Sequence, residues 1–401
     1  RMINKIEYFQ TLKQYATAGG VRYLDAIINA SGNLTQASKA LGTNHRTNAR
    51  LLQGIKRKAA KMGYAPNNDL TKPSPEGLHI RGVSTLYDDA GEVKIQWVKT
   101  EADKDDNLNR VIEAFTDAFA EHKGKSLLSK MPKLVNKDML TVYPMGDPHL
   151  GMLAWGAECG ESFDLKIAER DLIGAVKNLV DRSPPSETAI VLNLGDFFHS
   201  DNKASTTTAG TPVDTDGRWA KILNVGARAI IECVYSALKK HKKVIVKNII
   251  GNHDDHTSQA LSLALSLYFE NNKRVEVDNS PSKFWFYQHG QVLIGSTHGD
   301  TCKPEKLAGV MATDKAKEWG STTYRYWLTG HIHTKNSMEL QGCMWESFRT
   351  LAGKDAWHTG QGYRSGRDMS SIHFHNEFGE TERHTMSLGM LRITQQKGNK
   401  K

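Results

Sequence analysis

One stretch of this chain constrains its fold more than any other. Six mostly apolar residues, Ala189–Leu194, are followed at once by Gly195 and Asp196. A short apolar run that stops at a glycine is typical of a strand buried on both faces. The carboxylate of Asp196 then stands at the carboxyl end of that strand, where α/β proteins bind their ligands. The run therefore predicts a buried strand that presents a charged group in a crevice.

The sequence around this stretch alternates between strand and helix patterns. Apolar residues at helical spacing predict helices, and short apolar runs predict strands. Strands are predicted over 140–144, 244–250, 292–296 and 326–329, and helices over 165–180, 219–241 and 258–270. This alternation predicts an α/β architecture with ligands at the strand ends. Residues 342–394 are richer in strand signals.

The composition is that of an ordinary soluble protein. The chain has 401 residues, of which 39% are hydrophobic and 24% charged, which favours one large and one small domain. No apolar run approaches the roughly 18 residues of a membrane span, so no membrane is expected as a partner. The four cysteines are widely spaced, which predicts reduced thiols and a cytoplasmic location.

The positive charge is concentrated at the N-terminus. Residues 1–66 hold eleven Lys or Arg and two acids, whereas the remaining chain has 42 basic and 42 acidic residues. A strongly basic module beside a neutral body favours nucleic acid or another polyanion as a partner. A solvated basic helix face is the simpler alternative.

This module has the pattern of three helices, over about 21–30, 34–41 and 45–61. Gly42 suits a left-handed position and Asn44 an N-cap. The segment 34–44 resembles the helix–turn–helix of transcription regulators, whose third helix enters the major groove of DNA. The resemblance implies these DNA-contacting residues: Arg46, Asn48, Arg50, Lys56, Arg57, Lys58 and Lys61. A three-helix bundle for protein contacts or assembly remains open.

We therefore expect residues 1–66 to form a basic helix-turn-helix-like domain. Residues 67–135 are predicted to be a linker with a β-hairpin, over 83–87 and 93–98, and a helix over 107–122. The catalytic domain is predicted over 136–394, and a disordered tail over 395–401.

Five short motifs stand at or just after predicted strand ends, each combining a small or turn residue with a carboxylate, imidazole or amide. They are Asp147-Pro148-His149, Gly195-Asp196, Gly251-Asn252-His253-Asp254, His298-Gly299-Asp300 and Gly330-His331-Ile332-His333. Such oxygen and nitrogen ligands suit Mn²⁺, Fe or Zn²⁺.

In this order the motifs resemble the calcineurin-like metallophosphoesterase superfamily. The resemblance implies a four-layer α/β/β/α sandwich with two metal ions at the strand ends. One ion would be held by Asp147, His149, Asp196 and His333, and the other by Asp196, Asn252, His298 and His331. Asp196 is then the shared ligand.

The resemblance also implies a chemistry. Two divalent ions, with Mn²⁺ preferred over Fe or Zn²⁺, would activate a bridging hydroxide for in-line attack on phosphorus. His253 would face the substrate and stabilise or protonate the leaving oxygen. Asp254 either orients His253 or simply bonds to nearby backbone.

His199 indicates which branch of the superfamily the chain resembles. The segment Gly195–His199 is similar to the corresponding motif of SbcD-type DNA repair nucleases, and the chain also resembles phage-encoded proteins. The Gly-Asp-x-Val-Asp-Arg-Gly and Gly-Asn-His-Glu motifs of the serine/threonine phosphatase branch are not present. His199 is either catalytic or a buried support for another histidine.

The sequence thus predicts a metal-dependent phosphodiester hydrolase, with a DNA nuclease ahead of the alternatives. Those are a nucleotide or cyclic-nucleotide phosphodiesterase, and a DNA-binding scaffold with a vestigial metal site. DNA is the expected partner, while a homo-oligomer and an unidentified protein partner remain open. An aromatic and basic rim for stacked bases is a further hypothesis, built from Trp345, Trp357, Tyr363, Arg349, Arg364 and Arg367.

Overall fold

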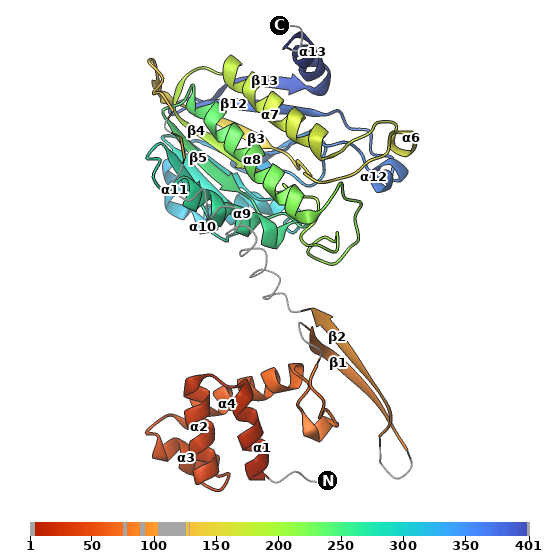
Figure 1. Cartoon of the computed structure of the whole chain (residues 1–401). Helices are drawn as coiled ribbons and strands as arrows, with labels where there is room; N and C mark the ends of the chain where they lie inside the picture. The colour runs from red at the N-terminus through yellow and green to blue at the C-terminus, as the bar shows by residue number, and fades with distance from the viewer. Residues whose placement is uncertain (1–4, 75–77, 89–92, 103–125, 128, 399–401) are drawn as a thin grey trace. The chain divides into compact units, whose positions relative to one another are not determined.

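The computed structural model describes residues 5–74, 78–88, 93–102, 126–127 and 129–398. The chain divides into two compact units, residues 1–107 and 108–401 (Figure 1). The helix predicted over 107–122 lies outside the described residues. The hairpin that the sequence analysis assigns to the linker belongs to the first unit.

The first unit contains four α-helices within its described residues, followed by a hairpin. The helices are α1 (Lys5–Leu12), α2 (Ala18–Asn29), α3 (Leu34–Ala40) and α4 (His45–Lys61), with 3₁₀ turns at Lys13–Tyr15 and Pro66–Asn68. The strands β1 (Leu78–Tyr87) and β2 (Val93–Ala102) pair antiparallel, which confirms the predicted hairpin. Phe9 and Leu12 of α1 complete the helical core, and this helix was missing from the prediction.

Turn residues set the ends of these helices as predicted. Gly42 has a φ of 62°, and the Asn44 side chain accepts a hydrogen bond of 2.8 Å from the Arg46 backbone N–H. Asn33 caps α3 in the same way, through the backbone N–H groups of Thr35 and Gln36. The caps satisfy donors that a helix start leaves without partners.

The second unit contains two sheets. The six-stranded sheet has the order β13-β12-β3-β4-β5-β6, and its strands are β3 (Asn136–Met145), β4 (Ser186–Asn193), β5 (Lys243–Asn248), β6 (Val275–Asp278), β12 (Asp368–His375) and β13 (Gly379–Ser387). Strands β3 to β6 run parallel, so their carboxyl ends share one edge.

The five-stranded sheet has the order β10-β11-β9-β8-β7. Its strands are β7 (Trp285–His289), β8 (Val292–Ser296), β9 (Tyr324–Thr329), β10 (Asn336–Leu340) and β11 (Cys343–Ser347). Strands β8, β9 and β11 are parallel.

Helices α7 (Leu165–Arg182), α8 (Trp219–Leu238) and α9 (Asp255–Tyr268) pack on the six-stranded sheet, and α10 (Pro304–Asp314) packs on the five-stranded sheet. The second unit also contains α6 (Gly156–Cys159), α11 (Ala316–Ser321), α12 (Ala356–Gly360) and α13 (Leu388–Gly398). Helix α13 packs on α7 through the buried Leu391, so the predicted disordered tail is wrong for residues 395–398.

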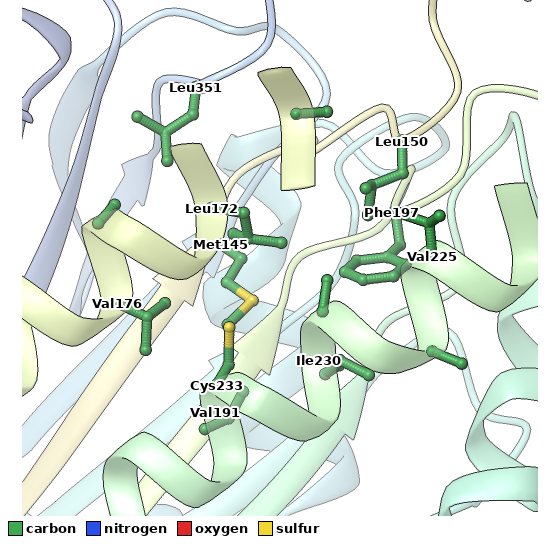
Figure 2. Close-up of a cluster of buried hydrophobic side chains, with 14 of the residues drawn as sticks. Met145, Leu150, Leu172, Val176, Val191, Phe197, Val225, Ile230, Cys233 and Leu351 are labelled. Atoms are coloured by element: carbon green, nitrogen blue, oxygen red, sulfur yellow. The ribbon is translucent and has the colours of Figure 1, made fainter. Parts of the chain in front are cut away.

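The side chains of β4 point alternately into two hydrophobic cores, one on each face of the sheet. Ala189 and Val191 point into the core shared with α7 and α8, whereas Ile190 and Leu192 point into the core between the sheets. Figure 2 shows the first core, where Met145 and Val191 gather with side chains of the two helices. A third core joins the five-stranded sheet to α10 through Trp327 and other residues. The four-layer α/β/β/α sandwich predicted from the sequence is therefore present.

A buried polar chain crosses the six-stranded sheet at the end away from the motifs. The imidazole of His241 lies 2.7 Å from the Tyr143 hydroxyl and 2.7 Å from the Ser186 hydroxyl. His373 continues the chain through Thr141. Burial, and next the neighbouring His373, lower the pKa of His241 to about 3.

This burial makes stability depend on pH. Between about pH 6.5 and pH 3 the unfolded chain binds a proton at His241 that the folded protein does not. Stability is therefore lost as the pH falls through this window. We expect His241→Gln to make the stability profile shallower near pH 5, by up to about 1.4 kcal/mol per pH unit. Urea unfolding at several pH values measures this slope, and His45→Gln at an exposed position is the control. Equal slopes in the variant and the wild type would contradict the prediction.

Candidate metal centre

The five motifs meet at one edge of the sandwich. Asp147 and His149 follow β3, Asp196 follows β4, and Asn252 follows β5. His298 follows β8 of the other sheet, and His331 and His333 follow β9. Parallel strands from both sheets therefore deliver all seven predicted ligands to the same place.

The first group of side chains contains one carboxylate and two imidazoles. The Nε2 atoms of His149 and His333 lie 3.1 Å apart. The His333 Nε2 atom is 3.6 Å from Oδ1 of Asp147. All three ligand atoms lie within 4.8 Å of one another, which is the spacing of groups that share one cation.

The second group lies around Asp196. The Nε2 atom of His298 is 3.2 Å from Oδ2 of Asp196 and 3.1 Å from Oδ1 of Asn252. His331 joins Asp196 and His298 within the same 4.8 Å limit. His298 also connects the two groups, because its Nδ1 atom is 3.9 Å from Oδ1 of Asp147.

The backbone is strained at these residues. Asp147, His149, Asp196, His331 and His333 all have a positive φ, between 42° and 70°. Within the described residues only three other non-glycine residues share this conformation, and none of them is in a motif. Left-handed backbone costs a non-glycine residue on the order of 1–3 kcal/mol, and such strain clusters at functional sites. Five strained residues in one cluster therefore indicate a functional site.

Glycines make room for the ligands. A Cβ atom at Gly251 would lie 2.1 Å from Oδ1 of Asp196, and one at Gly195 would lie 2.4 Å from Nδ1 of His298. At Gly330 it would lie 2.7 Å from Oδ2 of Asp147. The motif glycines are thus required by close approach of the ligand side chains.

Hydrogen bonds fix the orientation of the ligands. Nδ1 of His298 donates to the Leu194 carbonyl at 2.8 Å, which leaves Nε2 to face Asp196 and Asn252. Asp147 accepts from the His331 backbone N–H at 2.9 Å. A histidine held through one ring nitrogen has the other available as a metal ligand.

The two carboxylates are buried, so their charge needs compensation. Asp147 is fully buried and Asp196 is 2% exposed. Burial alone would raise the pKa of Asp196, but the positive charge of His298 outweighs it and the pKa is lowered. Burial lowers the pKa of His298, whereas Asp196 and Asp147 raise it, with a net result of about 10. Two aspartates with imidazoles and an amide oxygen suit divalent Mn, Fe or Zn, and these residues fit such ions.

The pKa values of His149 and His333, in the first group, are shifted in opposite directions. Burial lowers the pKa of His149 well below its ordinary value, and the adjacent His253 and His199 add to this effect. Burial also lowers the pKa of His333, but Asp147 more than compensates and raises it. His149 is therefore a neutral imidazole, the form that binds a metal.

His199 lies inside the protein rather than at its surface. It is 1% exposed, its Nδ1 atom is 3.1 Å from Nδ1 of His149, and its ring stacks on that of His253 with centroids 5.2 Å apart. Burial, and next His253, lower its pKa to about 3. These contacts are those of a buried support for another histidine, which is one of the two alternatives given above.

Asp254 does not orient His253. Its Oδ2 atom accepts a hydrogen bond of 2.9 Å from the Phe198 backbone N–H. The partner of His253 is instead the carbonyl of His199, 2.9 Å from Nδ1. The predicted catalytic role of Asp254 is thus replaced by the backbone-bonding alternative, because the turn after β4 takes up its carboxylate.

Three histidines, His149, His199 and His253, form a further group with ligand spacing. This group contains no carboxylate to balance the charge of a cation. The two groups that contain aspartate therefore suit a divalent ion better.

A helix beside the centre was not predicted as part of it. The ring of His358 stacks on His333, with centroids 5.0 Å apart and an angle of 18°. Its Nδ1 atom is 2.7 Å from Oδ1 of Asp355. The Asp-x-x-His spacing at a helix start is the sequence signal that could have indicated this pair.

The aromatic and basic rim is only partly present. Trp345 is buried, while Trp357 and Tyr363 are exposed. Arg349 forms an ion pair with Asp368 at 2.7 Å. Only part of the hypothesised rim therefore faces solvent.

On α4 the predicted DNA-contacting residues separate into two sets. Asn48 is 6% exposed, and its amide donates to the hydroxyls of Ser38 and Thr43 at 3.0 and 2.6 Å. Asn48 is therefore a structural residue, which corrects the prediction. The others are exposed basic residues: Arg46, Arg50, Lys56, Arg57, Lys58 and Lys61.

Comparison with known proteins gives structural similarity only. No protein-family profile and no curated protein matches the chain. Similar solved structures include a predicted phosphoesterase from Streptococcus pneumoniae, with 9% identity, a TM-score of 0.24, and coverage of 63% of this chain and 99% of that one.

Two others are vacuolar protein sorting 29 from Cryptosporidium parvum and a 5′-nucleotidase precursor from Thermus thermophilus. The first has 10% identity and a TM-score of 0.29, covering 63% of this chain and 100% of that one. The second has 11% identity and a TM-score of 0.27, covering 62% of this chain and 54% of that one. Among the described residues, no helix is long and apolar enough to cross a membrane.

The crowding at Gly251 predicts a specific loss of metal binding. We expect Gly251→Ala to displace Asp196 and weaken Mn²⁺ binding by about 10–100-fold or more. Gly309→Ala is the matched control, because a Cβ atom there meets nothing within 4 Å. Calorimetric titration with Mn²⁺, together with the Mn²⁺-dependent rise in melting temperature, measures the effect. Wild-type affinity in Gly251→Ala would show that Asp196 is not a ligand.

Proposed function

We propose that this chain is a phosphodiester hydrolase that uses two divalent metal ions, preferably Mn²⁺, and that its substrate is DNA. The observation that carries the proposal is the convergence of two aspartate–histidine groups, linked by His298, at the carboxyl ends of strands from both sheets. This arrangement supports membership of the calcineurin-like metallophosphoesterases, which the motif order resembles.

The roles of the ligands follow from their positions. Asp147, His149 and His333 would hold one ion, and Asn252, His298 and His331 the other, with Asp196 shared. Two such ions supply Lewis acidity to phosphoryl oxygens and a nucleophile at neutral pH. The burial of the carboxylates excludes water from the charges and so strengthens their attraction to cations.

His253 is the residue proposed to move a proton. Its backbone N–H donates to Oδ1 of Asp196 at 2.8 Å, and its Nδ1 atom is held by the His199 carbonyl. In the imidazolium form of His253, Nε2 is then the nitrogen that can give a proton to the leaving oxygen, while the Nδ1–H group stays bonded to the carbonyl. His199 keeps both His149 and His253 in place.

DNA is favoured over other phosphodiesters by the charge of the first unit. Six exposed basic side chains lie along α4. The Asn44 cap fixes the start of this helix. The motif around His199, similar to that of SbcD-type nucleases, points to the same substrate. Nucleotide phosphodiesterase activity and a scaffold function are the outcomes that the following assay separates.

The proposal is tested by Mn²⁺-dependent hydrolysis of linear duplex DNA, single-stranded DNA, RNA and small phosphodiesters. We expect cleavage of DNA by the wild type, and none by Asp196→Ala. His253→Ala should retain Mn²⁺ but lose about 10²–10⁴-fold in turnover, because it removes only a proton donor. Cleavage of small phosphodiesters alone would overturn the nuclease assignment, and loss of Mn²⁺ in His253→Ala would make His253 a ligand.

The basic face of α4 predicts salt-dependent binding of DNA. Each lost phosphate contact should reduce the slope of log affinity against log salt by about 1. We therefore expect Arg57→Ala and Lys58→Ala each to flatten this slope, measured by fluorescence anisotropy with a labelled duplex. Lys317→Ala, an exposed lysine of the second unit, is the control. An unchanged slope in both α4 variants would argue for a role of this unit in assembly.

A further inference from the structure

We propose that Trp357 and Tyr363 form a platform on which a nucleobase of the substrate stacks, directly beside the metal centre. This inference rests on the proposed phosphodiesterase function and specifies its substrate class. The substrate presents an unstacked base next to the phosphate that is cleaved, as a single strand or a nucleotide does.

The platform is attached to a metal-ligand candidate. The ring of His358 lies almost parallel to that of His333, with centroids 5.0 Å apart. Asp355 fixes His358 twice, through Nδ1 at 2.7 Å and through the backbone N–H at 2.8 Å. Helix α12 is therefore held at a defined place against the centre.

Two further aromatic rings contact the ring of His358. Trp357 stands perpendicular to His358 at 5.0 Å, and Tyr363 is 5.1 Å from His358 and 5.9 Å from Trp357. Trp357 is 60% exposed and Tyr363 is 36% exposed. A solvent-facing indole held by its neighbours is a surface on which any base can stack, since every base has a π-face.

The surroundings provide cationic side chains. Lys354 and Arg367 line a pocket together with His333, His358 and Tyr363. A phosphate next to the stacked base would meet the positive charge of Lys354, because Arg367 is already paired with Glu161 and donates to the Leu351 carbonyl. The pocket therefore lies between Tyr363 and the ligand candidate His333.

A second exposed tryptophan lies nearby. Trp155 is 69% exposed and directly precedes α6, which packs against α12 (Figure 1). Exposed apolar surface often marks a protein contact. Here the continuity with His333 and the polar pocket favours the substrate as the occupant.

The test compares two small substrates that differ only in the base. They are the p-nitrophenyl esters of thymidine 5′-phosphate and of deoxyribose 5-phosphate, assayed with Mn²⁺. We expect Trp357→Ala to reduce kcat/KM by about 5- to 100-fold for the thymidine ester and to leave the ester without a base nearly unchanged. Trp357→Phe should restore most of the activity.

Phe378→Ala is the control, because Phe378 is 61% exposed and stacks on His375, whose strand partner Met139 is far along β3 from the motif end. Equal losses on both esters, or none, would overturn the platform. A change in sedimentation of Trp357→Ala with an unchanged base preference would assign the patch to a protein contact.

If the wild type hydrolyses neither ester, the assay on DNA described above still decides the proposed function. Calorimetry of thymidine 5′-phosphate and deoxyribose 5-phosphate binding then still decides the inference. A weaker affinity of Trp357→Ala for the thymidine compound alone supports it, and equal affinities contradict it.

Discussion

The charge balance between two buried aspartates and the imidazoles around them is the constraint on which this structure depends. Asp147 and Asp196 have almost no exposed surface, and each lies within 4 Å of His298. Burying an unpaired carboxylate is costly, so this end of the sandwich needs compensating positive charge. His298 supplies positive charge, because these two carboxylates raise its pKa. The same residues, arranged in two groups, are suited to divalent cations.

The sandwich around this cluster explains how the chain tolerates it. Strand β4 is buried on both faces, with Val191 in the helical core and Ile190 in the core between the sheets. Each buried aliphatic side chain contributes on the order of 1.5–3 kcal/mol, which offsets the strain of left-handed backbone at the ligands. The rigid layers thus hold a cluster that would be unfavourable in isolation.

Local patterns in the sequence predicted the alternation of strands and helices with ligands at the strand ends, and the family that the motif order resembles implied the four layers. Alternation along β4 and the glycine before Asp196 are local signals, and the strands they predicted are present. The hydrogen-bond partners of Asp254 and Asn48 come from segments that only folding brings close, so the sequence did not show them. The stacking of His358 on His333 is likewise a tertiary contact, which the spacing of residues along the chain does not show.

Metal stoichiometry shows whether Asp196 is shared by two metal ions. Elemental analysis after equilibrium dialysis against Mn²⁺ gives the number of ions per chain. We expect two ions per chain in the wild type, one in Asn252→Ala, and none in Asp196→Ala. Far-ultraviolet circular dichroism would establish that the variants are folded. Retention of one ion by folded Asp196→Ala would contradict the shared ligand.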